Sequence, residues 1–114
     1  MTSAFPVRTH VDYTPSEQTQ LTITDDSQSE AFQALSSATA QSILGTLHDR
    51  PKPASEIAET VGTSVQNAQY HVAQLEENGF VESVDTWYSP KGTEMTVYAP
   101  TAQEFVVRFD ADDG

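Results

Sequence analysis

The sequence predicts an α+β fold that is mainly helical, with about four helices, a β-hairpin and a short strand near each end. Three observations support this fold class. Apolar residues recur at helical spacing between residues 31 and 75. Residues 80–88 and 94–100 are rich in Val, Trp, Tyr and Thr, and a Ser-Pro-Lys-Gly turn sequence separates them. A chain of 114 residues is long enough for one domain with a modest core.

The first two helices are expected within residues 27–49. Ser27 and Glu30 have the spacing of a capping box, which predicts a short helix that carries Phe32 and Leu35. The second helix is predicted from one apolar stripe, made by Ala40, Ile43, Leu44 and Leu47. The prolines at positions 51 and 53 are expected to end it.

A short third helix and a longer fourth helix follow. Ser55 is expected to cap the third helix and Gly62 to end it. Thr63 and Gln66 have capping-box spacing at the start of the fourth helix, and Asn78-Gly79 is expected to stop it. The fourth helix is expected to bury one stripe, made by Val65, Ala68, Val72 and Leu75.

Alternating apolar residues predict two further strands outside this helical region. Residues 19–24 alternate at Leu21 and Ile23, and residues 104–109 alternate at Phe105, Val107 and Phe109. The expected organisation is an irregular N-terminal arm at 1–26, one domain at 27–109 and an acidic tail at 110–114.

The charge balance is strongly acidic, with 17 Asp plus Glu against 5 Lys plus Arg and a formal net charge of −12. One interpretation is a disordered or solvated acidic segment, but the acids are scattered and apolar periodicity persists between them. A second is an acidic mimic of DNA. A third is adaptation to molar salt, which fits the two lysines and the frequent Asp, Glu and Thr.

The sequence gives no sign of catalysis or of a bound cofactor. Cysteine is absent, and the three histidines lie far apart on different elements. No Ser–His–Asp spacing, glycine-rich phosphate loop or His-x-x-x-His pair occurs. We therefore expect no enzyme activity, no cofactor and no metal. The absence of a signal peptide pattern and of an apolar run of membrane-spanning length predicts a cytoplasmic location.

The order of the predicted elements is that of a winged helix-turn-helix: a short helix, a glycine-containing turn, a longer helix and then a hairpin. Residues 34–44, 54–82 and 85–100 resemble the ArsR-like winged-helix regulators, and in particular the small helix-turn-helix domains of haloarchaea. The most specific stretch is QNAQYHVAQLEENGFV, residues 66–81. The resemblance implies a DNA-binding transcriptional regulator, usually a dimer. The chain departs from the metal-sensing members because it has no cysteine.

Residues 64–78 would then be the recognition helix in the major groove, and residues 86–97 the wing on the flanking backbone or minor groove. Thr63 to Leu75 carry no charge of either sign, which avoids repulsion of phosphates. Gln and Asn can pair with adenine edges. The candidate base-reading residues are Gln66, Asn67, Gln69 and Tyr70. Thr63 and Ser64 are expected at a phosphate, and Lys91, the wing's one cation, at the flanking DNA.

Each of these assignments has a structural alternative. Gln66 could complete the helix cap, Tyr70 could pack on the wing, and Lys91 could be a solvated turn residue. Arg50 and Lys52 could touch a flanking phosphate or belong to a solvated loop. His71 is expected to support the helix from its buried edge, and Trp87 and Tyr88 are expected to pack on the sheet.

A homodimer is expected to use the spare apolar surfaces, namely Phe32, Leu35, Phe105, Val107 and the strand at 19–24. Two recognition helices about one DNA turn apart would need an approximately palindromic operator.

High salt would screen the charges on the protein and on DNA, so a shallow or inverted salt dependence of DNA binding is expected, with cations bridging carboxylates and phosphates. The alternative function is a winged-helix protein–protein interaction module in a transcription or chromosome complex.

Overall fold

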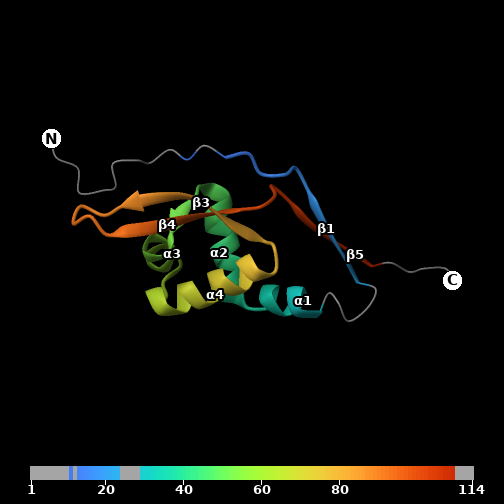
Figure 1. The fold of residues 1–114 in the computed structure, drawn as a ribbon. Coiled ribbons are helices and arrows are strands. Elements are labelled where there is room, and N and C mark those ends of the chain that lie inside the picture. The colour runs from blue at the N-terminus through green and yellow to red at the C-terminus, as the bar shows by residue number, and fades with distance from the viewer. Residues whose placement is uncertain (1–10, 12, 24–28, 110–114) are drawn as a thin grey trace.

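The computed structural model describes residues 11, 13–23 and 29–109. Within these residues the helices pack together beside a long hairpin, and a separate pair of strands lies at the end away from the hairpin tip (Figure 1). The elements in chain order are β1 (Thr19–Ile23), α1 (Ser29–Leu35), α2 (Ala38–Asp49), β2 (Lys52–Pro53), α3 (Ala54–Val61), α4 (Val65–Glu77), β3 (Val81–Tyr88), β4 (Glu94–Pro100) and β5 (Phe105–Phe109). The predicted fold class is confirmed.

Helix α2 supplies the centre of the core. Ser37 caps it by accepting a hydrogen bond from the Ala40 amide at 3.2 Å. All four residues of the predicted stripe are buried. They pack against the buried faces of α3 and α4 and against Phe80 and Val81, so the core lies under the helix-turn-helix and fixes its position.

Helix α1 packs against this core. Its predicted cap, Ser27, lies outside the described residues. Ala31 and Ala34 are buried, whereas Phe32 and Leu35 are half-buried and pack against the core. The Gln41 amide donates to the Leu35 carbonyl at 2.8 Å and so ties the end of α1 to α2.

A three-stranded antiparallel sheet, in the order β2-β4-β3, carries the hairpin. The two-residue strand β2 was not predicted. It forms because Lys52 and Pro53 pair with Tyr98 and Val97 of β4. This pairing also corrects the predicted start of α3. The helix begins at Ala54 with Pro53 at the cap position, so Ser55 already lies inside the helix.

Lys52 is buried, with 3% of its surface exposed. Its ammonium donates to the Thr46 carbonyl at 2.7 Å and to the Arg50 carbonyl at 3.3 Å, at the C-terminal end of α2. Burial lowers the pKa of Lys52, and the nearby Arg50 charge lowers it further. Lys52 therefore anchors the α2 end and the sheet to each other and does not face solvent.

The predicted strands near the two ends are confirmed, and they pair with each other in parallel to form a two-stranded sheet. Thr19 lies opposite Phe105 and Leu21 opposite Val107. A bridge between Ser16 and Ala102 extends the pairing toward the N-terminus. Leu21 is buried, and Phe105 packs edge-on against Phe80 with ring centroids 5.2 Å apart.

Among the described residues, no helix combines the length and the apolar composition that a membrane span requires.

Candidate nucleic-acid interface

The turn between α3 and α4 sets the direction of the fourth helix. Gly62 ends α3 in the left-handed conformation at φ 78°, as predicted. The amides of Gly62 and Thr63 both donate to the Ala58 carbonyl, at 2.9 and 3.0 Å. Because Thr63 still closes the end of α3, the N-cap of α4 falls one residue later, on Ser64. The Ser64 hydroxyl accepts from the Asn67 amide at 3.0 Å.

The predicted capping box of Thr63 and Gln66 is therefore wrong. Thr63 is half-buried, and its hydroxyl accepts a hydrogen bond from the side-chain amide of Asn67 at 2.9 Å. Asn67 is half-buried as well. These two residues join the turn to the first turn of the helix, while the Gln66 side chain is left exposed.

Helix α4 presents a polar outer face that carries no charge as far as Leu75, before the exposed Glu76 and Glu77 at its C-terminal end. Gln66, Gln69 and Tyr70 are exposed, and 60% of the Tyr70 surface is accessible. The Tyr70 ring meets the half-buried His71 ring edge-on, with centroids 5.2 Å apart. Ser64, at the helix N-terminus, is exposed beside them. The structure thus brings together the predicted polar side chains on one accessible surface.

Val65 is the exception to the predicted buried stripe. It is 44% exposed, whereas Ala68, Val72 and Leu75 are buried. The reason is its place as the first residue of α4, at the edge of a cleft and beyond the reach of the α2 core. The sequence pattern placed Val65 on the correct side of the helix but could not show where the core ends.

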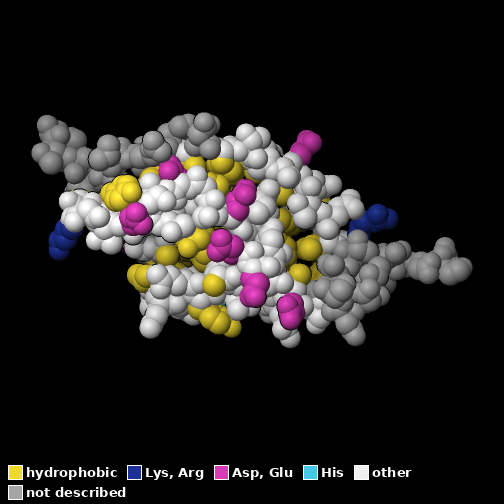
Figure 2. Space-filling view, in the orientation of Figure 1, with side chains coloured by type: hydrophobic (Ala, Val, Ile, Leu, Met, Phe, Trp, Pro, Cys, Tyr) yellow, Lys and Arg dark blue, Asp and Glu magenta, His cyan; other side chains and the backbone are white. Residues whose placement is uncertain are grey.

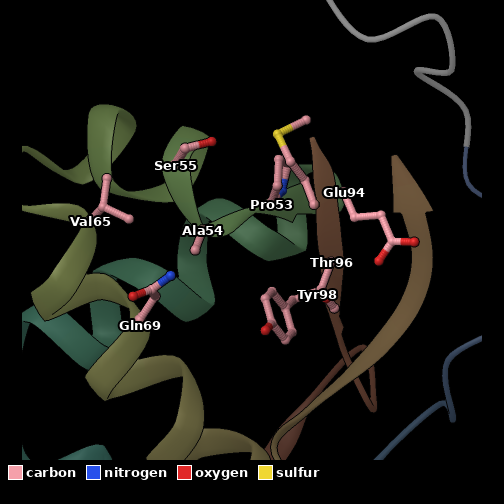
Figure 3. A pocket seen from close by; sticks show the side chains of 9 residues that line it. Pro53, Ala54, Ser55, Val65, Gln69, Glu94, Thr96 and Tyr98 are labelled. Atoms are coloured by element: carbon pink, nitrogen blue, oxygen red, sulfur yellow. The ribbon is translucent and has the colours of Figure 1, made fainter. Parts of the chain in front are cut away.

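A cleft of about 300 Å³ separates α4 from the hairpin (Figure 3). Gln69 of α4 and Tyr98 of β4 lie on opposite sides of it, and the start of α3 closes it from above in the view. Its lining residues are Pro53, Ala54, Ser55, Val65, Gln69, Glu94, Met95, Thr96 and Tyr98. Burial raises the pKa of the Tyr98 phenol, and the Glu76 charge raises it further, so the phenol stays neutral near neutral pH. Sequence patterns gave no sign of this cleft.

The hairpin places Lys91 at its tip. Gly92 takes φ 85°, and its amide donates to the Ser89 carbonyl at 2.8 Å, so the predicted turn is confirmed. Lys91 is exposed. Trp87 is buried as expected, but Tyr88 is 55% exposed, and its hydroxyl donates to the Glu94 carboxylate at 3.4 Å. Tyr88 is therefore not a sheet-packing residue. Strand alternation explains the difference, because successive side chains point to opposite faces.

Cations are scarce on this surface. Arg50 forms an ion pair with Glu56, and Lys52 is buried, so neither offers a free charge to a flanking phosphate. On the face shown in Figure 2, basic side chains appear only near the two ends and acidic ones are spread between them. Within the described residues, no group of three or more His, Cys, Asp or Glu side chains could hold a metal ion.

Residues 35–84 match the family model described as a helix-turn-helix domain. No curated protein matches the sequence. Similar solved structures include a homodimeric winged helix-turn-helix DNA-binding domain from Mycobacterium bovis, described as a possible ArsR-family transcriptional regulator. It has 22% identity and a TM-score of 0.57 and covers 68% of this chain and 67% of that chain.

A Mycobacterium tuberculosis protein has 20% identity and a TM-score of 0.56, over 68% of this chain and 72% of that chain. An ArsR family transcriptional regulator has 24% identity and a TM-score of 0.51, over 63% and 72%. The chain therefore contains a helix-turn-helix domain, and its overall fold is the winged helix-turn-helix fold of these structures.

Proposed function

We propose that this protein is a sequence-specific DNA-binding transcriptional regulator. The observation that carries the proposal is the outer face of α4 from its start to Leu75, which is polar, accessible and free of charge in a chain of net charge −12. An exposed helix face in so acidic a protein would ordinarily carry Asp or Glu. A neutral face is what a polyanionic partner requires, since carboxylates there would repel phosphates.

We divide the residues predicted to contact DNA into three groups, according to their exposure and hydrogen bonds. Gln66, Gln69 and Tyr70 are free to reach base edges from the N-terminal half of the helix, and glutamine can pair with the N6 and N7 atoms of adenine. The side-chain amide of Asn67 could contact DNA only after breaking its hydrogen bond to Thr63. We therefore assign these two residues to the stabilisation of the turn. Neither then needs to touch a base or a phosphate directly.

Two residues remain for the DNA backbone. Ser64 lies exposed at the N-terminus of α4, where amide groups and the helix dipole favour a phosphate. We assign Lys91, which is exposed at the wing tip, to the flanking backbone or minor groove. The Glu94 carboxylate beside the cleft would need a bridging cation if a phosphate came close to it.

The regulator is proposed to act as a homodimer in a cell of high internal salt. The similar Mycobacterium bovis domain is homodimeric. A two-fold dimer would place two α4 helices on an approximately palindromic operator with half-sites about one DNA turn apart. The acidic composition with two lysines supports the high-salt setting.

The test is selection of binding sites from a random duplex DNA library, at about 2 M and about 0.2 M KCl because salt sets the strength of phosphate contacts. The wild-type protein should enrich a partly palindromic motif, and Gln66→Ala/Tyr70→Ala should lose it. Gln33→Ala, which removes an exposed glutamine from α1, is the control and should retain the motif.

Failure of the wild-type protein to enrich any motif at either salt concentration, while its circular dichroism shows a folded domain, would contradict the proposal. That result would favour the alternative, a winged-helix module that binds a protein. The cleft between α4 and β4, with Val65, Met95 and Tyr98 in its lining, would then be the surface to test.

A further inference from the structure

The two-stranded sheet of β1 and β5 is anchored to the core through Leu21 and Phe105 but is otherwise little covered by the other described elements. The principal contacts of each strand are with the other strand. Parallel strands are ordinarily covered on both faces, and an isolated pair of strands is marginally stable in water. In this sheet Val107 is 51% exposed. Within the described residues, β5 has a neighbour on one edge only.

The backbone directions along β5 follow from its pairing with β1. The Thr19 amide donates to the Glu104 carbonyl at 2.9 Å, and Thr19 lies opposite Phe105. Alternate residues of a strand direct their backbone groups to opposite edges. Val106 and Arg108 therefore direct theirs toward β1, as Glu104 does. The amide and carbonyl of Phe105 and of Val107 point to the open edge.

We propose that β5 pairs antiparallel with β5 of a second copy of this chain, with the two-fold axis at Val106. In this register Phe105 lies opposite Val107 of the partner subunit, and the two residues exchange both backbone hydrogen bonds. The same pairing occurs twice by symmetry. All four outward amide and carbonyl groups of Phe105 and Val107 are then satisfied, and the two small sheets become one four-stranded sheet.

The side chains fit the same register. Glu104 and Arg108 are both exposed and lie two residues on either side of Val106. Antiparallel pairing about Val106 sets Glu104 opposite Arg108 of the partner subunit, twice, so opposite charges meet. The exposed Val107 also gains the partner's Phe105 as its cross-strand neighbour.

Charge also supports a second copy of this chain as the pairing partner, and β5 as the edge strand that pairs. Two chains of net charge −12 repel over most of their surface. Residues 105–107 are uncharged, and the charges that flank them are mutually complementary. The other edge strand, β1 at Thr19–Ile23, has no charged residue that could fix a register.

The chain has no cysteine, so single cysteines report the register directly. Opposed residues of a non-hydrogen-bonded antiparallel pair have Cα atoms about 4.5 Å apart, which suits a disulfide. Val106→Cys should therefore form a covalent dimer on mild oxidation. Glu104→Cys and Arg108→Cys should not form one alone, because each lies about 13 Å from its own copy. An oxidised mixture of these two variants should cross-link.

Sedimentation of the same protein supplies an independent test of the charge pair. Arg108→Glu should weaken the dimer about tenfold, since two attractive pairs become repulsive, and Glu104→Arg/Arg108→Glu should restore it. Circular dichroism checks that each variant remains folded. The pairing is overturned if the wild-type chain is monomeric, or if it dimerises while Val106→Cys fails to cross-link. The inference extends the proposed dimer, but neither test involves DNA, so loss of DNA binding leaves it untouched.

Discussion

The roles of Arg50 and Lys52 depend on burial and on ion pairing, which the residue type alone does not reveal. From sequence, Arg50 and Lys52 were equally compatible with a phosphate contact and a solvated loop. The structure uses both internally, one in an ion pair with Glu56 and the other as a buried cap on α2. That leaves Lys91 as the exposed cation of the wing.

Replacing Lys52 should therefore destabilise the fold. Lys52→Met keeps the apolar stem but leaves the Thr46 and Arg50 carbonyls without their donor, so we expect the free energy of unfolding to fall by about 1–3 kcal/mol. Urea denaturation measures the change. Lys91→Met removes an exposed lysine and should change stability by no more than about 0.5 kcal/mol. Equal effects of the two substitutions would show that the Lys52 hydrogen bonds contribute nothing.

The side chains of the candidate interface were predicted by type, but their hydrogen bonds were not. Helical periodicity identified Gln66, Gln69 and Tyr70 as outward residues, because a helix wheel needs only the sequence. It could not separate them from Asn67, whose amide is held by Thr63. That contact depends on the N-cap being at Ser64, one residue later than the spacing rule suggested. A shift of one residue at a helix start is within the ordinary uncertainty of such rules.

At the scale of elements, the two glycines of the α2–α3 region have opposite roles. Gly62 takes φ 78° at the helix-turn-helix turn, whereas Gly45 lies exposed inside α2, and a Cβ at either position would meet no atom within 4 Å. Since crowding is absent at both, backbone conformation alone decides the effect of a substitution.

Gly62→Ala should lower the free energy of unfolding by about 1–2 kcal/mol, because a residue with a Cβ is strained in the left-handed region. Gly45→Ala should raise it by up to about 1 kcal/mol through better helix propensity. Gly62→Asn should cost less than Gly62→Ala, since asparagine tolerates this conformation better. Urea titrations of the three variants provide the comparison. A stabilising Gly62→Ala would mean that the turn does not hold this conformation in solution.

Elements whose signal is local were predictable, and those that depend on distant partners were not. The four helices and the hairpin each carry their own periodicity, caps or turn residues. Strand β2 has two residues and exists because β4 lies beside it. The strands at 19–23 and 105–109 were expected from alternation, but their parallel pairing joins segments more than 80 positions apart. No pattern within either segment specifies that pairing.

At the scale of the whole molecule, the distribution of charge decides how DNA binding can respond to salt. Each phosphate neutralised by a basic side chain contributes about −0.9 to the slope of log K against log salt. A dimer whose only such contacts come from its two Lys91 side chains should show a slope near −2. An ordinary interface with six or more phosphate contacts would give about −5 or steeper.

Fluorescence anisotropy with the selected operator, between about 0.2 M and 2 M KCl, measures this slope. Lys91→Met should bring it close to zero, since the wing cation is then gone. If Glu94 takes up a bridging cation when a phosphate approaches, Glu94→Gln should make the slope more negative, because cation uptake on binding is lost. Glu94→Gln should then also strengthen DNA binding at the lower salt concentration, where repulsion between the carboxylate and the phosphates is least screened. A slope of −5 in the wild-type protein would show that basic residues other than Lys91 neutralise phosphates in the complex.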